Sequence, residues 1–251
     1  TLFPYTTLFR SRSADGKKEG LKPLMSELLQ LDLSARAKTY WSMVKRVPVG
    51  PVGFISPFNF PLNLAAHKIA PAIVAGCPFV LKPASATPIG ALVIGEVLAE
   101  TKLPKGAFSI LPMNSADAGA LVTDERLKLL SFTGSPPVGW DMKNRAGKKA
   151  VILELGGNNA IIVTPSADVN IVLTGAVFGA VGTCGQRCTS TRRLIVHESL
   201  FEEVKAKMAK AYTQLRIGDP LDQHNHVGPL IDKAAVAAYL NSIEQCKAQG
   251  G

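Results

Sequence analysis

The chain has 251 residues, 47% of them hydrophobic, and a formal net charge of +9 from 28 Lys+Arg against 19 Asp+Glu. That length and apolar content suit one or two α/β domains with a substantial core. The four cysteines lack the paired spacing of a disulfide framework, so we expect a reducing compartment and a cytoplasmic protein. The basic residues are scattered over helix faces without interleaved aromatic residues, which argues against a nucleic-acid partner.

The first twenty residues differ in character from the rest. Thr-Leu-Phe occurs at 1–3 and again at 7–9, and a polar run follows to residue 20. This pattern has no continuous apolar core, so it is not a secretory signal, and we expect Thr1–Ser11 to be foreign sequence. Because no stretch reaches eighteen unbroken apolar residues, we expect no membrane span.

Between residues 26 and 155, short apolar runs alternate with helical patterns. A weak helix is expected over Ser26–Met43, and the later alternation predicts βαβ units that form an open parallel sheet of the Rossmann type, with helices on both faces. The predicted strands are Val52–Ser56, Phe79–Lys82, Ala107–Leu111, Leu127–Phe132 and Ala150–Leu155, and the predicted helices are Leu64–Val74, Ile89–Lys102, Ala116–Thr123 and Pro137–Ala146.

A second α/β region is expected from residue 156 onward, with Gly156-Gly157 as the hinge. The domain prediction is therefore 21–155 for the first domain and 156–251 for the second. Its predicted elements are the strands Asn158–Val163 and Thr191–His197 and the helices Asp168–Val181, Leu200–Leu215 and Lys233–Gln249.

Cys188 lies in a glycine-flanked turn of small residues, which suits a thiol that substrate can approach. We interpret it as a nucleophile, and a buried structural thiol is the alternative. A zinc site is not expected, because Cys184 and Cys188 have no matching Cys/His pair.

One predicted strand ends at Gly134-Ser135, where a helix begins. In an open parallel sheet, ligands bind at the carboxyl ends of the strands and helix N-termini receive phosphate. The Ser135 hydroxyl and nearby backbone N–H groups suit a pyrophosphate, with an ordinary helix N-cap as the alternative.

Four motifs in the same order and spacing resemble the aldehyde dehydrogenase superfamily, in particular its lactaldehyde and semialdehyde branch. The similarity runs from about Pro48 to the end of the chain. Members of the family are much longer, so the chain resembles a fragment that is truncated at both ends. The motifs are Pro57-Phe-Asn59, Phe132-Thr-Gly-Ser135, Glu154-Leu-Gly-Gly157 and Gly185-Gln-Arg-Cys188.

This resemblance implies a site for NAD or NADP in the first domain and part of a catalytic domain after it. Lys82 matches the family's Lys-Pro motif, which binds the adenosine ribose. Where NAD-preferring relatives carry a glutamate, this chain has Ser85, so we expect NADP to be accepted or preferred. Met113-Asn-Ser115 departs from a glycine bend common in relatives. The implied cofactor-binding residues are Ile55, Ser56, Pro57, Phe58, Lys82, Ser85, Gly134, Ser135, Val138, Leu155 and Gly156.

The resemblance also implies catalytic roles. Cys188 attacks the aldehyde, Asn59 and the Cys188 N–H hold the oxyanion, and Glu154 activates water against the thioester. Glu154 favours hydrolysis over transfer of the acyl group to coenzyme A, which remains the alternative. Arg187 suits an anionic group on the substrate, which favours an acidic semialdehyde, or a phosphorylated or hydroxylated short aldehyde, over a purely apolar one. Its alternative roles are a salt bridge to the missing part of the protein and support for the thiolate.

Two further hypotheses remain open from the residues. A cysteine hydrolase needs a histidine close to Cys188, and His197 lies nine residues further on. A non-catalytic nucleotide-binding fragment is the other. His67 and His197 are expected to be structural, and the resemblance implies a homo-oligomer for the full-length protein.

Overall fold

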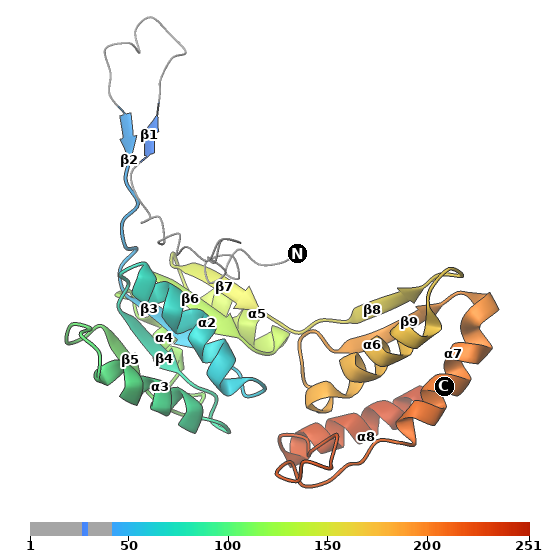
Figure 1. Cartoon of the computed structure of the whole chain (residues 1–251). Helices are drawn as coiled ribbons and strands as arrows, with labels where there is room; N and C mark the ends of the chain where they lie inside the picture. Colours follow the sequence, from blue (N-terminus) through green and yellow to red (C-terminus); the bar gives the residue numbers. More distant parts are fainter. Residues whose placement is uncertain (1–26, 30–41) are drawn as a thin grey trace, which may run out of the picture. The chain divides into compact units, whose positions relative to one another are not determined.

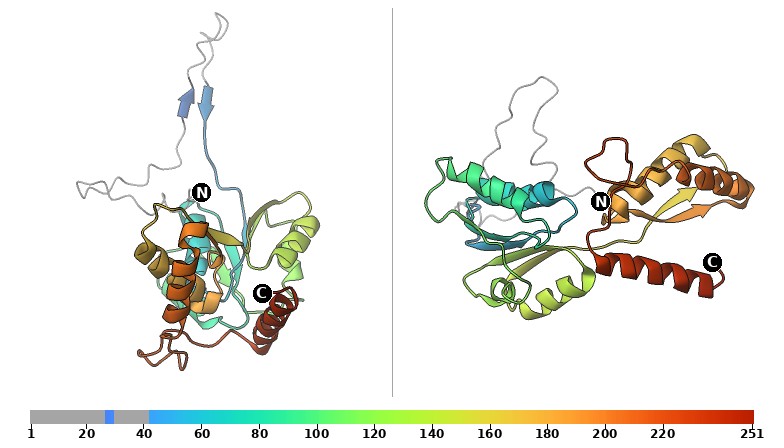
Figure 2. Two further views of the ribbon diagram at one scale, coloured as in Figure 1. Left: turned by 90° about the vertical axis from the view of Figure 1, so that its right-hand side faces the viewer. Right: turned by 90° about the horizontal axis from the view of Figure 1, so that it is seen from below.

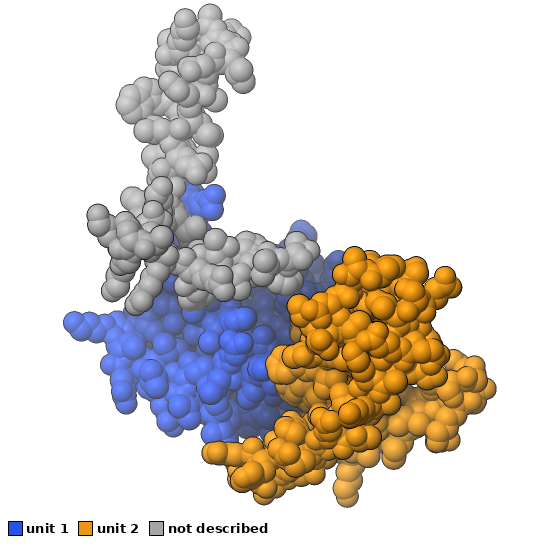
Figure 3. Space-filling model, turned by 45° about the vertical axis from the view of Figure 1, so that its right-hand side comes forward, with its two compact units in different colours: residues 1–154 blue, residues 155–251 orange. Residues whose placement is uncertain are grey.

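The computed structural model describes residues 27–29 and 42–251 (Figure 1). The chain divides into two compact units between Glu154 and Leu155, one residue before the boundary expected from the sequence. Figure 3 colours the two units separately. The prediction for residues 1–20 lies outside the described residues.

The predicted helix over Ser26–Met43 is wrong at both of its described ends. The strand β1 (Glu27–Leu29) pairs with β2 (Ser42–Val44) in an antiparallel ladder, and residues 30–41 lie outside the description. Ladder pairing overrides the weak helical pattern here, because strand formation depends on cross-strand neighbours more than on intrinsic preference.

The first unit is built on a five-stranded sheet of order β5-β4-β3-β6-β7, with every neighbouring pair parallel. The predicted strands are confirmed within two residues at each end, because continuous apolar runs mark strands that are buried on both faces. Their bounds are β3 Val52–Ile55, β4 Phe79–Lys82, β5 Phe108–Ile110, β6 Leu129–Thr133 and β7 Ala150–Glu154.

Four helices connect these strands and cover the sheet (Figure 2). Right-handed crossovers from the central β3 outward through β4 to β5 place two helices on one face, and the connections to β6 and β7 place the other two on the opposite face. The helices are α2 Pro61–Val74, α3 Ile89–Ala99, α4 Gly119–Thr123 and α5 Pro136–Arg145.

The core of the first unit lies between β3, β4 and the two helices that follow them. Leu81 is fully buried, and the ring of Phe79 lies 5.7 Å from that of Phe54 and 5.9 Å from that of Phe108. This packing fixes the strand ends that carry the predicted site.

The second unit has a parallel pair of strands, β8 (Asn159–Val163) and β9 (Thr191–Val196). Asp168 caps the helix that follows β8, since its carboxylate accepts hydrogen bonds from the N–H groups of Asn170 and Ile171. The helical elements are α6 Val169–Val181, the short turn η2 Gly182–Gly185, α7 Glu198–Tyr212 and α8 Lys233–Ala248.

Candidate active site

The carboxyl ends of four parallel strands gather most of the predicted site residues of the first unit. Ile55 at the end of β3 pairs with Lys82 at the end of β4 and with Phe132 in β6, and Thr133 pairs with Glu154 at the end of β7. The chain order reverses between β3 and β6, which is where an open α/β sheet has its ligand crevice.

The segment after β3 enters this edge with its backbone fixed. Ser56 is buried, and its N–H donates to the Lys82 carbonyl at 3.1 Å. The side-chain oxygen of Asn59 accepts from the Phe60 N–H at 3.1 Å, just before α2 begins. Because the amide oxygen is held against the backbone, the NH₂ group of Asn59 lies on the opposite side of the amide, as an oxyanion donor requires.

Lys82 and Ser85 form a short polar chain at the end of β4. Burial lowers the pKa of Lys82, whose ammonium donates to the Ser85 hydroxyl at 3.1 Å. Ser85 in turn donates to the Met113 carbonyl at 3.3 Å. The Met113 segment, which departs from the family's pattern, thus contacts the predicted ribose-binding residues, and a neutral hydroxyl stands where a carboxylate would repel a 2′-phosphate.

The start of α5 is a weaker anion site than the sequence suggested. Ser135 occupies the N-cap position without a side-chain capping bond, which leaves its hydroxyl for another partner. Pro136 and Pro137 fill the first two helical positions and have no N–H to donate. A phosphate at this terminus would be held by the Ser135 hydroxyl and the Val138 N–H.

Gly134, between β6 and this helix, admits no other residue without a shift. A Cβ at this position would lie 2.5 Å from the ring of Phe132, and the Gly134 N–H donates to the Glu154 carbonyl at 3.0 Å. The predicted cofactor turn is therefore joined directly to the strand that carries Glu154.

Glu154 is half-buried and has a charged partner that the sequence reasoning missed. Lys68 in α2 is only 7% exposed, and its ammonium donates to the Ser131 hydroxyl at 2.8 Å. Burial lowers the pKa of Lys68 to about 8, while the Glu154 carboxylate acts in the opposite direction and favours its charge. A glutamate in an apolar strand is costly to bury alone, and Lys68 supplies the compensating charge.

A signal for Lys68 was present in the sequence. Ala65, Ile69 and Ala72 form the buried stripe of α2, and Lys68 stands in the same stripe. A lysine on the apolar face of an amphipathic helix is unusual unless it is paired.

In the second unit, Cys188 is exposed and follows a left-handed turn. Thr183, Cys184 and Gly185 have φ values of 56°, 55° and 69°. Left-handed backbone is unfavourable for residues that carry a Cβ, and most of all for a β-branched threonine, so contacts of this loop must hold it. The predicted turn is confirmed, but this conformation was not foreseen.

Those contacts come from side chains on both sides of the turn. The Cys184 thiol donates to the Gly228 and Pro229 carbonyls at 3.1 and 3.3 Å. The Gln186 side-chain oxygen accepts from the Ile231 N–H at 3.0 Å. The loop that carries the predicted nucleophile is therefore tied to residues 228–231.

Arg187 is placed against its own loop. Its Nε donates to the Thr183 hydroxyl at 2.9 Å, and the guanidinium lies 5.0 Å from the ring centre of Phe178 in α6. This arrangement sets a cation one residue before the predicted nucleophile. The remaining predicted residues of this unit, Leu155 and Gly156, begin it directly after β7.

The geometry disfavours a Cys–His hydrolase built on His197. Cys188 precedes β9 and His197 follows it, and the six residues of that strand separate its ends by roughly 17 Å. The His197 ring also accepts from the Ser199 N–H as the N-cap of α7. His197 is structural, as predicted.

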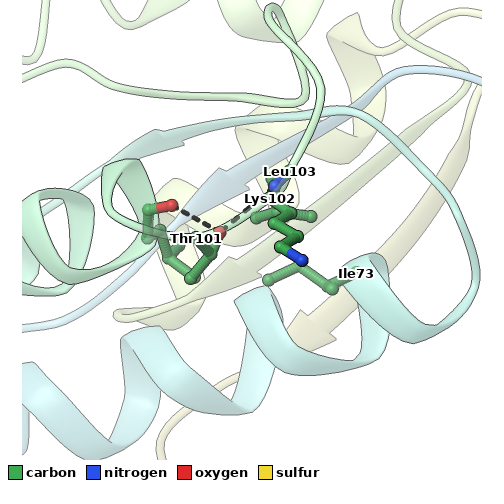
Figure 4. A pocket seen from close by; sticks show the side chains of 5 residues that line it. Ile73, Thr101, Lys102 and Leu103 are labelled. Atoms are coloured by element: carbon green, nitrogen blue, oxygen red, sulfur yellow. Dashed lines mark hydrogen bonds between the residues drawn. The ribbon is translucent and has the colours of Figure 1, made fainter.

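The shallow hollow of about 350 Å³ in Figure 4 lies at the other end of the first unit's helices. It is lined by Ile73, Leu98 and residues 101–103. The Thr101 hydroxyl in this hollow donates to the Leu98 carbonyl and accepts from the Leu103 N–H. We assign it no function.

Two kinds of feature are absent from the described residues, a metal site and a membrane-spanning helix. Within 27–29 and 42–251, no group of three histidine, cysteine, aspartate or glutamate side chains is arranged to hold a metal ion. In the same part of the chain, no helix is long and apolar enough to cross a membrane.

Comparison with known proteins matches residues 20–251 to the aldehyde dehydrogenase family model. The chain is 45% identical over 214 residues to a Caenorhabditis elegans homolog of aldehyde dehydrogenase family 7 member A1, covering 81% of this chain and 40% of that protein. It is 44% identical over 213 residues to alpha-aminoadipic semialdehyde dehydrogenase of Bos taurus, covering 81% and 39%.

A solved structure is similar in sequence and in fold. It is aldehyde dehydrogenase 21 from Physcomitrella patens in complex with the reaction product succinate, with 50% identity and a TM-score of 0.81 over 84% of this chain and 44% of that one. The chain thus spans about 40% of the length of the relatives it matches.

Proposed function

The chain belongs to the aldehyde dehydrogenase family, and on that premise we propose that the full-length protein oxidises an aldehyde to a carboxylic acid with NAD+ or NADP+. The observation that carries this proposal is the edge of the parallel sheet, where Asn59, Lys82 and Glu154 follow or end three of its parallel strands. The exposed thiol of Cys188 in the second unit supplies the nucleophile.

The residues of the chain account for both halves of the reaction. The Cys188 sulfur forms a bond to the carbonyl carbon, and the oxyanion that results is held by the Asn59 amide and the Cys188 N–H. When bound, the nicotinamide ring supplies the hydride acceptor. Loss of the hydride from the carbon bound to Cys188 would leave a thioester. Glu154 takes a proton from the water that attacks this thioester, the carbon–sulfur bond breaks, and the acid and the thiol are released.

The residues fit a dinucleotide along the switch point of the sheet. Lys82 and Ser85 suit the adenosine ribose, and the Ser135 hydroxyl with the Val138 N–H suits a phosphate. The other contacts of the proposed cofactor site come from the ends of β3, β6 and β7 and the residues just after them, Ile55, Ser56, Pro57, Phe58, Gly134, Leu155 and Gly156.

NADP is accepted or preferred, because Ser85 and Lys82 leave the ribose site without a carboxylate. The support is the hydrogen bond from the Lys82 ammonium to the Ser85 hydroxyl. A kcat/KM ratio that strongly favours NAD would contradict this part of the proposal.

The substrate class is an acidic semialdehyde. The Bos taurus relative is named for alpha-aminoadipic semialdehyde, and the Physcomitrella patens enzyme holds succinate as its product, so both names point to a substrate with a carboxylate. Arg187, next to Cys188, provides a cation for such a group. We also infer a homo-oligomer in the cytoplasm, in line with the family resemblance and the four unpaired cysteines.

The test is formation of reduced cofactor by the full-length protein, with NAD and NADP in parallel and a panel of acidic and apolar aldehydes. We expect the Cys188→Ser variant to lose turnover by roughly three orders of magnitude or more, because the covalent route is removed. Cys246→Ala, which changes an exposed cysteine of α8, should retain wild-type turnover and is the control.

The other outcomes assign other functions. Turnover that appears only with coenzyme A would move the protein to the acylating subclass. Nucleotide binding without turnover under any condition would leave a non-catalytic nucleotide-binding protein.

A further inference from the structure

Asn159, the first residue of β8, holds the backbone around Cys188 from the side. Its side-chain nitrogen donates to the Cys188 carbonyl at 2.8 Å and to the Ser190 carbonyl at 3.1 Å. Because both partners are carbonyl oxygens, the contacting atom must be the NH₂ nitrogen, and both of its hydrogens are used.

We propose that Asn159 is a positioning residue that fixes the backbone conformation of Cys188 and thereby the directions of its thiol and its N–H. The proposal rests on the proposed role of Cys188 as the nucleophile. It assigns a function to a side chain in the strand opposite the nucleophile's loop.

The start of β8 is packed closely enough to act in this way. A Cβ on Gly157 would lie 2.8 Å from the Cys188 carbonyl oxygen, so at this point the two backbones are in contact. Asn159 pairs with Thr191, but Ala160 pairs with Arg193, which makes Arg192 the extra residue of a bulge. Bulges change the direction of neighbouring side chains, and this one adjoins the Asn159 pair.

The peptide before Cys188 is fixed by a second device. Ser190 is 1% exposed, its hydroxyl accepts from the Arg187 N–H at 3.1 Å, and its own N–H donates to the Arg187 carbonyl at 3.2 Å. The peptide bond is trans, so the Cys188 N–H points away from the Arg187 carbonyl and out of this turn. Among the described residues, that N–H has no hydrogen-bond partner.

The two devices together determine the nucleophile's geometry. Ser190 fixes the peptide that contains the Cys188 N–H, and Asn159 fixes the peptide that contains the Cys188 carbonyl. With both neighbouring peptide planes held, the φ and ψ angles of Cys188 are set, and so is its Cα–Cβ direction. Removing the Asn159 amide frees one of the two planes.

The test is Asn159→Asp in the full-length protein, because the side chains match in shape while two donors become acceptors facing two carbonyls. We expect kcat to fall roughly a hundredfold with KM for aldehyde and cofactor unchanged, as for a misplaced reacting group. Lowering the pH protonates the introduced carboxyl, returns one donor, and should recover part of the lost kcat. The matched control is Asn158→Ala, which changes the exposed asparagine just before Asn159. This variant should retain wild-type kcat.

A measurement without turnover separates this proposal from the proposed function. The rate of Cys188 alkylation by iodoacetamide, followed by peptide mass spectrometry, should slow roughly tenfold in Asn159→Asp, about the effect of one lost hydrogen bond. If the wild-type protein oxidises no aldehyde but the alkylation difference persists, the dehydrogenase proposal fails and the positioning role stands.

Wild-type kcat and wild-type alkylation in Asn159→Asp would overturn the positioning role. If that variant does not fold, Asn159→Ser provides the same test with one remaining donor. Intermediate kcat in Asn159→Ser supports the proposal, and wild-type kcat overturns it.

Discussion

Strands of similar apolar sequence have different surroundings in the two units. All four residues of β3 are buried, whereas Ile162 in β8 is 71% exposed and Ile195 in β9 is 50% exposed. The strand β3 has a hydrogen-bonded neighbour on each side and helices on both faces of its sheet, while β8 and β9 have only each other as strand neighbours in the described chain. An apolar run therefore predicts a strand, and the neighbouring elements decide how deeply it is buried.

The strongest test of this comparison is a pair of alanine substitutions, one in each unit. Leu81→Ala in β4 should lower the free energy of unfolding by roughly 2–5 kcal/mol, because it leaves a cavity in a fully closed core. Ile162→Ala in β8 should change it by less than about 0.5 kcal/mol. Urea unfolding of both variants measures the difference, and equal effects would show that the second unit is as tightly packed as the first.

A charge inside the first unit gives the next largest effect. The pKa of Lys68 falls from 10.5 to about 8 on folding. Between these two pH values the unfolded chain binds more protons at this site than the folded chain, so the free energy of unfolding rises with pH. The rise amounts to about 3 kcal/mol across the whole interval. Replacing Lys68 by Met should therefore raise the free energy of unfolding near pH 7 by about 2 kcal/mol, since the lost bond to Ser131 offsets part of the gain.

Urea unfolding of wild type and Lys68→Met at pH 7 and at pH 10 checks this. The gap between the two proteins should shrink at the higher pH. Lys105→Met, at an exposed position, is the control and should show no such change. A gap that is the same at both pH values would contradict a buried, charged Lys68.

The smallest expected effect concerns the left-handed turn of the second unit. Cys184 has a φ of 55°, a conformation that glycine adopts without strain. Cys184→Ala removes the thiol contacts and keeps the strain, while Cys184→Gly removes both, so the glycine variant should be more stable than the alanine variant by about 1 kcal/mol. Thermal unfolding compares them, and an alanine variant of equal or greater stability would argue against strain at this position.

The parallel sheet could be predicted from the sequence because its signals are local. The run Phe79–Lys82 stands between a glycine-containing loop and a proline, and the strand has the predicted bounds. The same local rules failed at 26–43, where a weak helical pattern was expected to form a helix and cross-strand pairing formed β1 and β2. Pairing with a distant segment is not visible in a single window of sequence.

The site could be predicted where a residue type and its place at a strand end agree, as for Lys82, Gly134 and Glu154. Asn159 was missed because its role depends on a bulge and on two backbone carbonyls more than twenty-five residues away. The left-handed turn at 183–185 was missed because threonine and cysteine do not signal that conformation. What the sequence cannot reveal here is backbone geometry that is imposed by distant partners.

The two prolines that open α5 have a consequence for the order of the whole sheet edge. Each ring holds φ near −65°, the value of the first helical turn, so Pro136 and Pro137 lose little conformational entropy when the helix forms. The turn from β6 into α5 is thus rigid before anything binds to it. Rigidity at this point is gained in exchange for two hydrogen-bond donors, so recognition there depends on the two donors that remain, the Ser135 hydroxyl and the Val138 N–H, both held in a preset place.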